Sequence, residues 1–178
     1  RSKQKVGTKT YGYFLTHVKN DFLNEKATVN VFDYTNVKSD KLTLYTDVLA
    51  SEKEGRSGLG LRSQFVYQIS AFKRRSGSIV YFEDDFELND FGYLKKRDWF
   101  HIGLGNDFTK VDFNKNSSLE ERQIGIDFNY DSDTAGNSNP ATVRQEFNFT
   151  YVDTSKFQIS WDLKTSGKDT TITRKNID

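Results

Sequence analysis

The chain of 178 residues contains no cysteine, no methionine and only one proline. Without cysteine it cannot form a disulfide, a thiolate metal site or a cysteine nucleophile. The lack of cysteine is compatible with a location in the cell envelope. No methionine or signal-like apolar stretch opens the sequence, so we expect a piece of a longer or processed protein. A run of about 18 apolar residues is also lacking, which excludes a transmembrane helix.

An excess of charge of either sign is lacking as well. Lys and Arg number 26 and Asp and Glu 25, and the resulting net charge of +1 gives little attraction to a polyanion. We therefore expect no nucleic-acid partner. The mean hydropathy of −0.74 resembles that of a soluble protein, but strands that face lipid with alternate residues also average out as polar.

What the sequence does contain is alternation of apolar and polar residues. In RQIGIDFNYD, residues 122–131, the apolar side chains Ile124, Ile126, Phe128 and Tyr130 alternate with Gln123, Gly125, Asp127 and Asn129. Residues 142–151 and 157–163 repeat this pattern. Each of the three segments therefore predicts a β-strand with one apolar and one polar face.

Six earlier segments are rich in β-branched and aromatic residues, with connectors of Asn, Asp, Gly or Ser between them: residues 10–18, 27–34, 42–49, 59–72, 77–82 and 99–113. They bring the expected strands to nine, with residues 170–173 as the candidate for a tenth. No window has helical spacing, so the sequence predicts an all-β chain.

We predict an antiparallel up-and-down transmembrane β-barrel, with residues 1–178 as one barrel domain or barrel segment and residues 83–98 as an inserted loop. Residues 59–72 and 99–113 reach the roughly 9–11 residues that a tilted membrane strand needs. Tyrosines stand near strand ends, as interfacial girdles require: Tyr11, Tyr34, Tyr130 and Tyr151. Because the chain stops just after an apparent turn, we expect the barrel to continue. The alternative is a soluble β-barrel or sandwich that binds a ligand, since water would solvate the polar faces.

The stretch EDDFELNDFGYLKKRDW, residues 83–99, lies between two expected strands. It contains the pairs and triplets Asp85-Phe86, Asn89-Asp90, Gly92-Tyr93-Leu94 and Arg97-Asp98. This order resembles an outer-membrane β-barrel family of unknown function that follows a family-9-type carbohydrate-binding module in Gram-negative envelope proteins. VGTKTYGYFLTHV (residues 6–18) and DTTITRKNID (169–178) resemble the first strand and a late segment of the same family. The chain departs from the family pattern after Arg174, where Lys175 and Asn176 replace glycines.

The resemblance implies an outer-membrane location in a Gram-negative bacterium, contact with outer-membrane lipid, and a fused periplasmic or surface carbohydrate-binding module as partner. It implies no activity. We expect the chain to act without enzymatic function as an anchor, channel or receptor linked to a glycan or small solute, and to hold no cofactor. The polar faces of the long strands supply the candidate lumen residues Arg62, Gln64, Gln68, His101, Asp127, Arg144 and Glu146.

The acidic stretch supplies the loop candidates Glu83, Asp84, Asp85, Glu87, Asp90 and Arg97. Its carboxylates suit calcium or acid/base chemistry. The interpretation we favour is a loop without metal that folds over or into the barrel mouth and packs through Phe86, Phe91, Tyr93 and Leu94. A barrel-embedded hydrolase that uses His101 and an acidic partner is the third hypothesis, although the sequence shows no nucleophile motif. Residues 131–139 predict an exposed surface loop, because the glycine that an EF-hand requires is misplaced.

Overall fold

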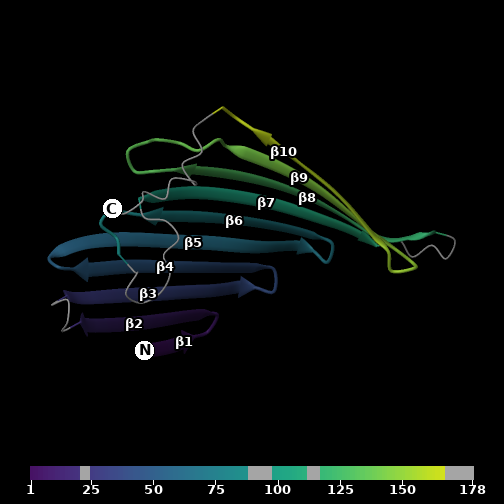
Figure 1. Ribbon diagram of the computed structural model, residues 1–178. Coiled ribbons are helices and arrows are strands. Elements are labelled where there is room, and N and C mark those ends of the chain that lie inside the picture. The colour runs from purple at the N-terminus through teal and green to yellow at the C-terminus, as the bar shows by residue number, and fades with distance from the viewer. Residues whose placement is uncertain (21–24, 88–97, 112–116, 167–178) are drawn as a thin grey trace.

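The computed structural model describes residues 1–20, 25–87, 98–111 and 117–166. These residues form one ten-stranded antiparallel sheet in which each strand pairs with its neighbours in sequence (Figure 1). The strands are β1 Ser2–Val6, β2 Lys9–Asn20, β3 Glu25–Ser39, β4 Leu42–Lys53, β5 Arg56–Ser70, β6 Lys73–Phe82, β7 Trp99–Val111, β8 Leu119–Ser132, β9 Thr142–Tyr151 and β10 Lys156–Lys164. The prediction of an all-β antiparallel meander is confirmed.

The sheet is strongly curved and twisted but open (Figure 1). β1 and β10 are its two edges and lie at opposite sides of the sheet in that view. The expected closed barrel is therefore not present in the described part of the chain. No helix capable of spanning a membrane occurs among these residues.

Several strands are longer than expected; β3 runs to Ser39 instead of residue 34, and β6 begins at Lys73 instead of residue 77. β1, with the sequence SKQKV, was not expected, because a short edge strand rich in charge lacks the apolar alternation that marks the others. The expected strand at 59–72 ends at Ser70, where a register shift after Gln68 leads into a turn whose Phe72 N–H bonds to the Ser70 hydroxyl. The candidate strand at 170–173 lies outside the described residues.

The connections differ in length between the two ends of the sheet. At the end where β2, β4, β6, β8 and β10 begin, the connections have 2, 2, 2, 7 and 4 residues. At the opposite end they have 4, 2, 16 and 9 residues. The two-residue turn there is formed by Glu54 and Gly55, whose φ angles of 51° and 78° are those of the type I′ turn that suits a twisted hairpin.

The register assigns the side chains to two faces, because directly paired residues of adjacent strands point to the same side. The polar face carries Asp47, Arg62, His101, Asp127 and Arg144, and the apolar face carries Leu44, Phe65, Leu104, Phe128 and Leu163. Along β2 and β3 the separation is weaker, since Phe14 and Val31 pair with each other on the polar face.

The polar face also holds the small hydrophobic core of the described chain. Val80, Phe82 and Phe86 are buried together, with Leu49 and Trp99 packed against them. Phe86 belongs to the segment after β6, which folds back over the polar face, and its side chain is fully buried. The rings of Phe82 and Phe86 stack with centroids 4.9 Å apart.

Candidate functional site

The seven lumen candidates all lie on the polar face. Gln68 is paired with Arg74, Gln64 with Ser78, and Arg62 with Asp47, which places the three β5 candidates on that side. His101 is paired with Asp131, and Asp127 with Arg144. Glu146 follows Arg144 by two residues in β9, so it lies on the same face, and its register partners are Gly125 and Ser160.

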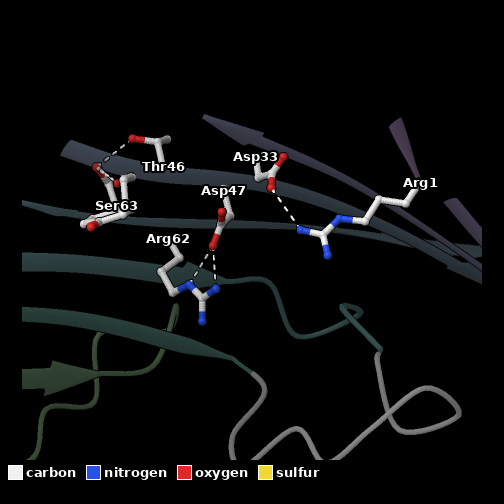
Figure 2. A network of polar contacts seen from close by, with 7 residues as sticks. Arg1, Asp33, Thr46, Asp47, Arg62 and Ser63 are labelled. Carbon is white, nitrogen blue, oxygen red and sulfur yellow. Dashed lines mark hydrogen bonds and ion pairs between the residues drawn. The ribbon is translucent and has the colours of Figure 1, made fainter. Parts of the chain in front are cut away.

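Ion pairs lie at the β1–β5 end of the polar face. Arg62 Nε of β5 donates to Asp47 Oδ2 of the neighbouring β4 at 2.8 Å, and Arg1 Nη2, just before β1, lies 3.8 Å from Asp33 Oδ1 of β3 (Figure 2). Figure 2 also shows a hydrogen bond between β4 and β5 on the apolar face, where the hydroxyls of Thr46 and Ser63 are 3.0 Å apart. The β4–β5 pair is therefore bonded through charges on one side and through neutral hydroxyls on the other.

A second group of charges occupies β6 to β10. Arg74 pairs with Asp107 at 2.7 Å, and Arg144 bonds Asp162 through two nitrogens at 2.8 and 3.1 Å. Asn148 Nδ2 donates to Glu146 Oε1 at 2.6 Å. Each of these two arginines is thus paired with an aspartate on the next strand, and the surface carries charges of both signs.

Three hollows lie along the polar face. The largest, about 280 Å³, includes Gln68, Arg74, Asp107 and Glu146 in its lining. A second, about 260 Å³, includes Gln64, Ser78, Gly103 and Asn129, and a third, about 210 Å³, includes Asp47 and Arg62. The amide, hydroxyl and charged groups around these hollows can donate and accept hydrogen bonds to a small hydrophilic solute.

The acidic segment is fastened to the sheet by backbone and side-chain bonds. Glu83 Oε2 accepts from the Leu59 N–H at 2.8 Å, and the Glu87 N–H donates to the Ser51 hydroxyl at 3.0 Å. Asp84 and Asp85 are exposed. Among the described residues, no three His, Asp or Glu side chains are grouped so as to hold a metal ion. Asp90 and Arg97, with Phe91, Tyr93 and Leu94, lie outside the described residues.

The connection between β8 and β9 is a surface loop, as predicted, with residues 134–138 exposed. Asp133 accepts from both the backbone and the side-chain amide of Asn137, each at 2.7 Å. This side-chain bond to Asn137 is the main reason that the pKa of Asp133 lies below its ordinary value. Asp98 Oδ1 accepts from the Thr134 N–H at 2.6 Å, so the loop is tied to the end of the acidic segment.

His101 is part of a chain of polar contacts that sequence reasoning did not find. Its Nδ1 lies 3.2 Å from Asp131 Oδ1, and its Nε2 lies 3.4 Å from the Ser78 hydroxyl. Trp99 Nε1 donates to the same Asp131 oxygen at 2.6 Å. Ser78 and Asp131 were missed because they are 53 residues apart in sequence (131 − 78) and meet only through the strand register.

Comparisons of the chain with protein-family models, with curated proteins and with solved structures found no match.

Proposed function

We propose that the chain is part of an outer-membrane β-barrel whose apolar face contacts lipid and whose polar face lines the lumen. In this role it anchors its protein in the envelope and forms the wall of a channel or receptor for a polar, glycan-like solute. The observation that carries the proposal is the uncovered apolar face. Its exposed large side chains range from 36% to 60% exposure and include Phe32, Val48, Phe65, Ile79, Leu104, Phe108, Ile126, Ile159, Trp161 and Leu163.

An apolar surface of this extent needs an apolar environment, because monomeric soluble proteins rarely expose more than a few hundred Å² of contiguous apolar patch. The apolar face spans all the strands from β2 to β10. In the described strands, the charged residues that the register places on this face stand toward the strand ends: Lys9, Lys19, Lys26, Glu52, Lys73, Arg75, Lys110 and Arg122. A central band without charge, flanked by charged ends, suits a bilayer.

The band of apolar residues also runs obliquely across the sheet: it does not follow the line of directly paired residues from strand to strand. Successive register pairs connect Lys9 of β2 through Leu44, Phe65, Leu104 and Phe128 to Leu163 of β10. Lys9 is the first residue of β2 and precedes the apolar residues of that strand. Leu163, on the same line of register pairs, is the last apolar residue of β10, which runs in the same direction as β2. Such a drift is expected when strands are tilted across a flat apolar slab, as in a sheared barrel.

Two further features support the proposal. The longer connections gather at one end of the sheet and the shorter ones at the other, which is the asymmetry of outer-membrane barrels. The open edges β1 and β10 require pairing in lipid, where unsatisfied backbone groups are costly. The proposal therefore includes further strands that close the barrel.

The two tryptophans offer a direct test, because they are the only ones in the sequence and lie on opposite faces. The chain is reconstituted into vesicles that contain brominated lipid, and each tryptophan is observed alone in the Trp99→Phe or Trp161→Phe variant. We expect the lipid to quench the fluorescence of Trp161 strongly and that of Trp99 little. Equal quenching, or a chain that stays in solution without detergent, would instead support a soluble β domain whose apolar face is covered by protein.

A further inference from the structure

Three side chains from adjacent strands form a connected row on the polar face: Ser78 on β6, His101 on β7 and Asp131 on β8. We propose that they form a hydrolytic site for small carboxylic esters, with Ser78 as nucleophile, His101 as general base and Asp131 as the group that orients the imidazole. This activity goes beyond the anchoring and solute-binding role. It does not depend on the membrane location, since the three strands are contiguous in the sheet.

The sheet register produces this arrangement. His101 and Asp131 are direct partners across β7 and β8, and their nearest polar atoms, Nδ1 and Oδ1, are 3.2 Å apart. Ser78 stands diagonally from His101, because its direct partner is Gly103, and diagonal neighbours on one face remain within reach of long side chains. The separation of 3.4 Å between the Ser78 hydroxyl and His101 Nε2 is typical of a resting catalytic pair, which tightens when substrate binds.

The protonation pattern that catalysis needs also follows from these contacts. Asp131 accepts from Trp99 Nε1 and from His101 Nδ1, which assigns the imidazole proton to Nδ1 and leaves Nε2 free to accept from Ser78. The side chains of His101 and Asp131 are 17% and 28% exposed. They are thus held by their surroundings while the hydroxyl of Ser78 adjoins an open hollow.

Gly103 supplies the space in which a substrate carbonyl can lie. A Cβ atom at this position would be 2.7 Å from the Ser78 hydroxyl, 3.0 Å from His101 Nε2 and 3.3 Å from Asn129 Oδ1. Nucleophile, base and a carboxamide therefore converge on one point that is open only because the residue is glycine. This point adjoins the hollow of about 260 Å³ described above.

The carboxamides of Gln64 and Asn129 flank this point. Successive register pairs join Gln64, Ser78, Gly103 and Asn129 into one row across four strands. Each carboxamide has an N–H₂ group that rotation can direct toward the space above Gly103. These two groups are the donors that we assign to the developing oxyanion.

The reaction is an acyl transfer to water. Ser78 Oγ attacks the ester carbonyl carbon while His101 Nε2 takes the hydroxyl proton. Collapse of the tetrahedral oxyanion breaks the bond to the alcohol, which leaves with the proton from Nε2. Water then attacks the acyl-serine, gives its proton to Nε2, and the carboxylic acid is released as the proton returns to Ser78. The hollow of about 260 Å³ is small and its lining mixes polar and apolar groups, which suits an ester with a short acyl group.

The test uses the whole chain, purified in detergent, with two probes: a fluorophosphonate that labels activated serines, and p-nitrophenyl acetate. We expect the label on Ser78, located by peptide mass spectrometry. We expect the hydrolysis rate to fall by about 100-fold or more in Ser78→Ala and His101→Gln, because general-base catalysis contributes roughly 10²–10⁴-fold. Gly103→Ala should reduce both readouts by filling the substrate space.

Ser160→Ala is the matched control. Ser160 lies on the same face in β10, outside the hollow, and its register partner is Glu146 rather than a histidine. This variant should keep both the label and the rate. Asp131→Asn tests the orienting role: an amide at this position can hold the imidazole in the wrong tautomer, so kcat should fall while KM and the circular dichroism spectrum stay unchanged.

Absence of label on Ser78 in the folded wild-type chain would overturn the proposal, since that result does not depend on any variant. A rate in Ser78→Ala equal to that of the wild type, with an unchanged far-ultraviolet circular dichroism spectrum, would overturn it as well. Either result would reduce the row to a hydrogen-bond chain that holds β6, β7 and β8 together.

Discussion

The two faces of the sheet are built by the same strands but differ in how their side chains are satisfied. On the polar face, charged groups find partners within the sheet, as Arg62 does with Asp47 and Arg144 with Asp162. On the apolar face, side chains such as Leu104 and Ile159 are about half exposed and find no cover in the described residues. Several charged groups of the polar face are therefore paired within the sheet, whereas the apolar face depends on its surroundings.

A charge introduced in the middle of each face should give the largest difference. Phe147 and Asn148 are adjacent in β9 and point to opposite faces. In lipid, Phe147→Arg should lower the free energy of unfolding by about 2–4 kcal/mol, because an arginine near the bilayer midplane costs that much. Asn148→Arg should change it by less than about 0.5 kcal/mol, as surface substitutions usually do.

Urea unfolding of the two variants in lipid vesicles measures this difference. The arginine in Asn148→Arg also has Glu146 within reach, since Asn148 already bonds that carboxylate. Equal and small effects at both positions would mean that water solvates both faces, and the contrast between them would be lost.

The folded-back acidic segment is where the polar face acquires a core, and its fit depends on a glycine. A Cβ at Gly58 would lie 2.3 Å from the Phe86 backbone nitrogen and 2.5 Å from the Asp85 carbonyl carbon. Gly58→Ala should therefore displace the segment and cost about 1–3 kcal/mol, as overpacking typically does. Loss of hydrogen-exchange protection at the Glu87 amide, which bonds Ser51, would report the displacement.

Gly125→Ala is the control for this variant. Gly125 also lies in a strand on the polar face, but a Cβ there would meet only ordinary contacts, at 3.6 Å from Asp107 and 3.9 Å from Glu146. We expect Gly125→Ala to leave Glu87 protected. If both variants keep that protection, the segment is held by its side-chain bonds rather than by close packing over Gly58.

Much of the fold could be predicted from local sequence, because period-two alternation sets both the strand and the face of each residue. This was sufficient for β8, β9 and β10 and for the common side of Arg62, His101 and Arg144. It failed for β1, whose five residues carry two lysines and one valine, and it could not separate the faces of β2 and β3, where apolar residues stand on both. The expected burial of Phe86 in a folded-over loop is confirmed.

The site was far less predictable, because its contacts cross strands. The alternation placed His101 on the wet side of β7 but gave no information on which residue of β6 or β8 would face it. A register shift of two residues would keep every side chain on its face and yet separate Ser78, His101 and Asp131. The register depends on turn lengths and bulges, such as the shifts at Gln68 and Leu119, that the sequence pattern does not reveal.

The smallest expected effect concerns the two cross-strand pairs of β4 and β5. A double-mutant cycle with Asp47→Asn and Arg62→Gln should give a coupling of about 0.2–1 kcal/mol, as for other exposed ion pairs. A cycle with Thr46→Val and Ser63→Ala should give a comparable coupling of about 0.5–1.5 kcal/mol for the neutral hydrogen bond on the opposite face. Salt distinguishes the two, since raising it from about 0.1 to 1 M shortens the Debye length from about 10 to 3 Å.

If the polar face lines a water-filled lumen, the Asp47–Arg62 coupling should fall as salt is raised and the Thr46–Ser63 coupling should not. The measurement is the free energy of unfolding of all variants at the two salt concentrations. A salt-independent Asp47–Arg62 coupling would show that ions do not reach this part of the polar face. The pair would then be enclosed by protein, and a solute could not pass along the face at that point.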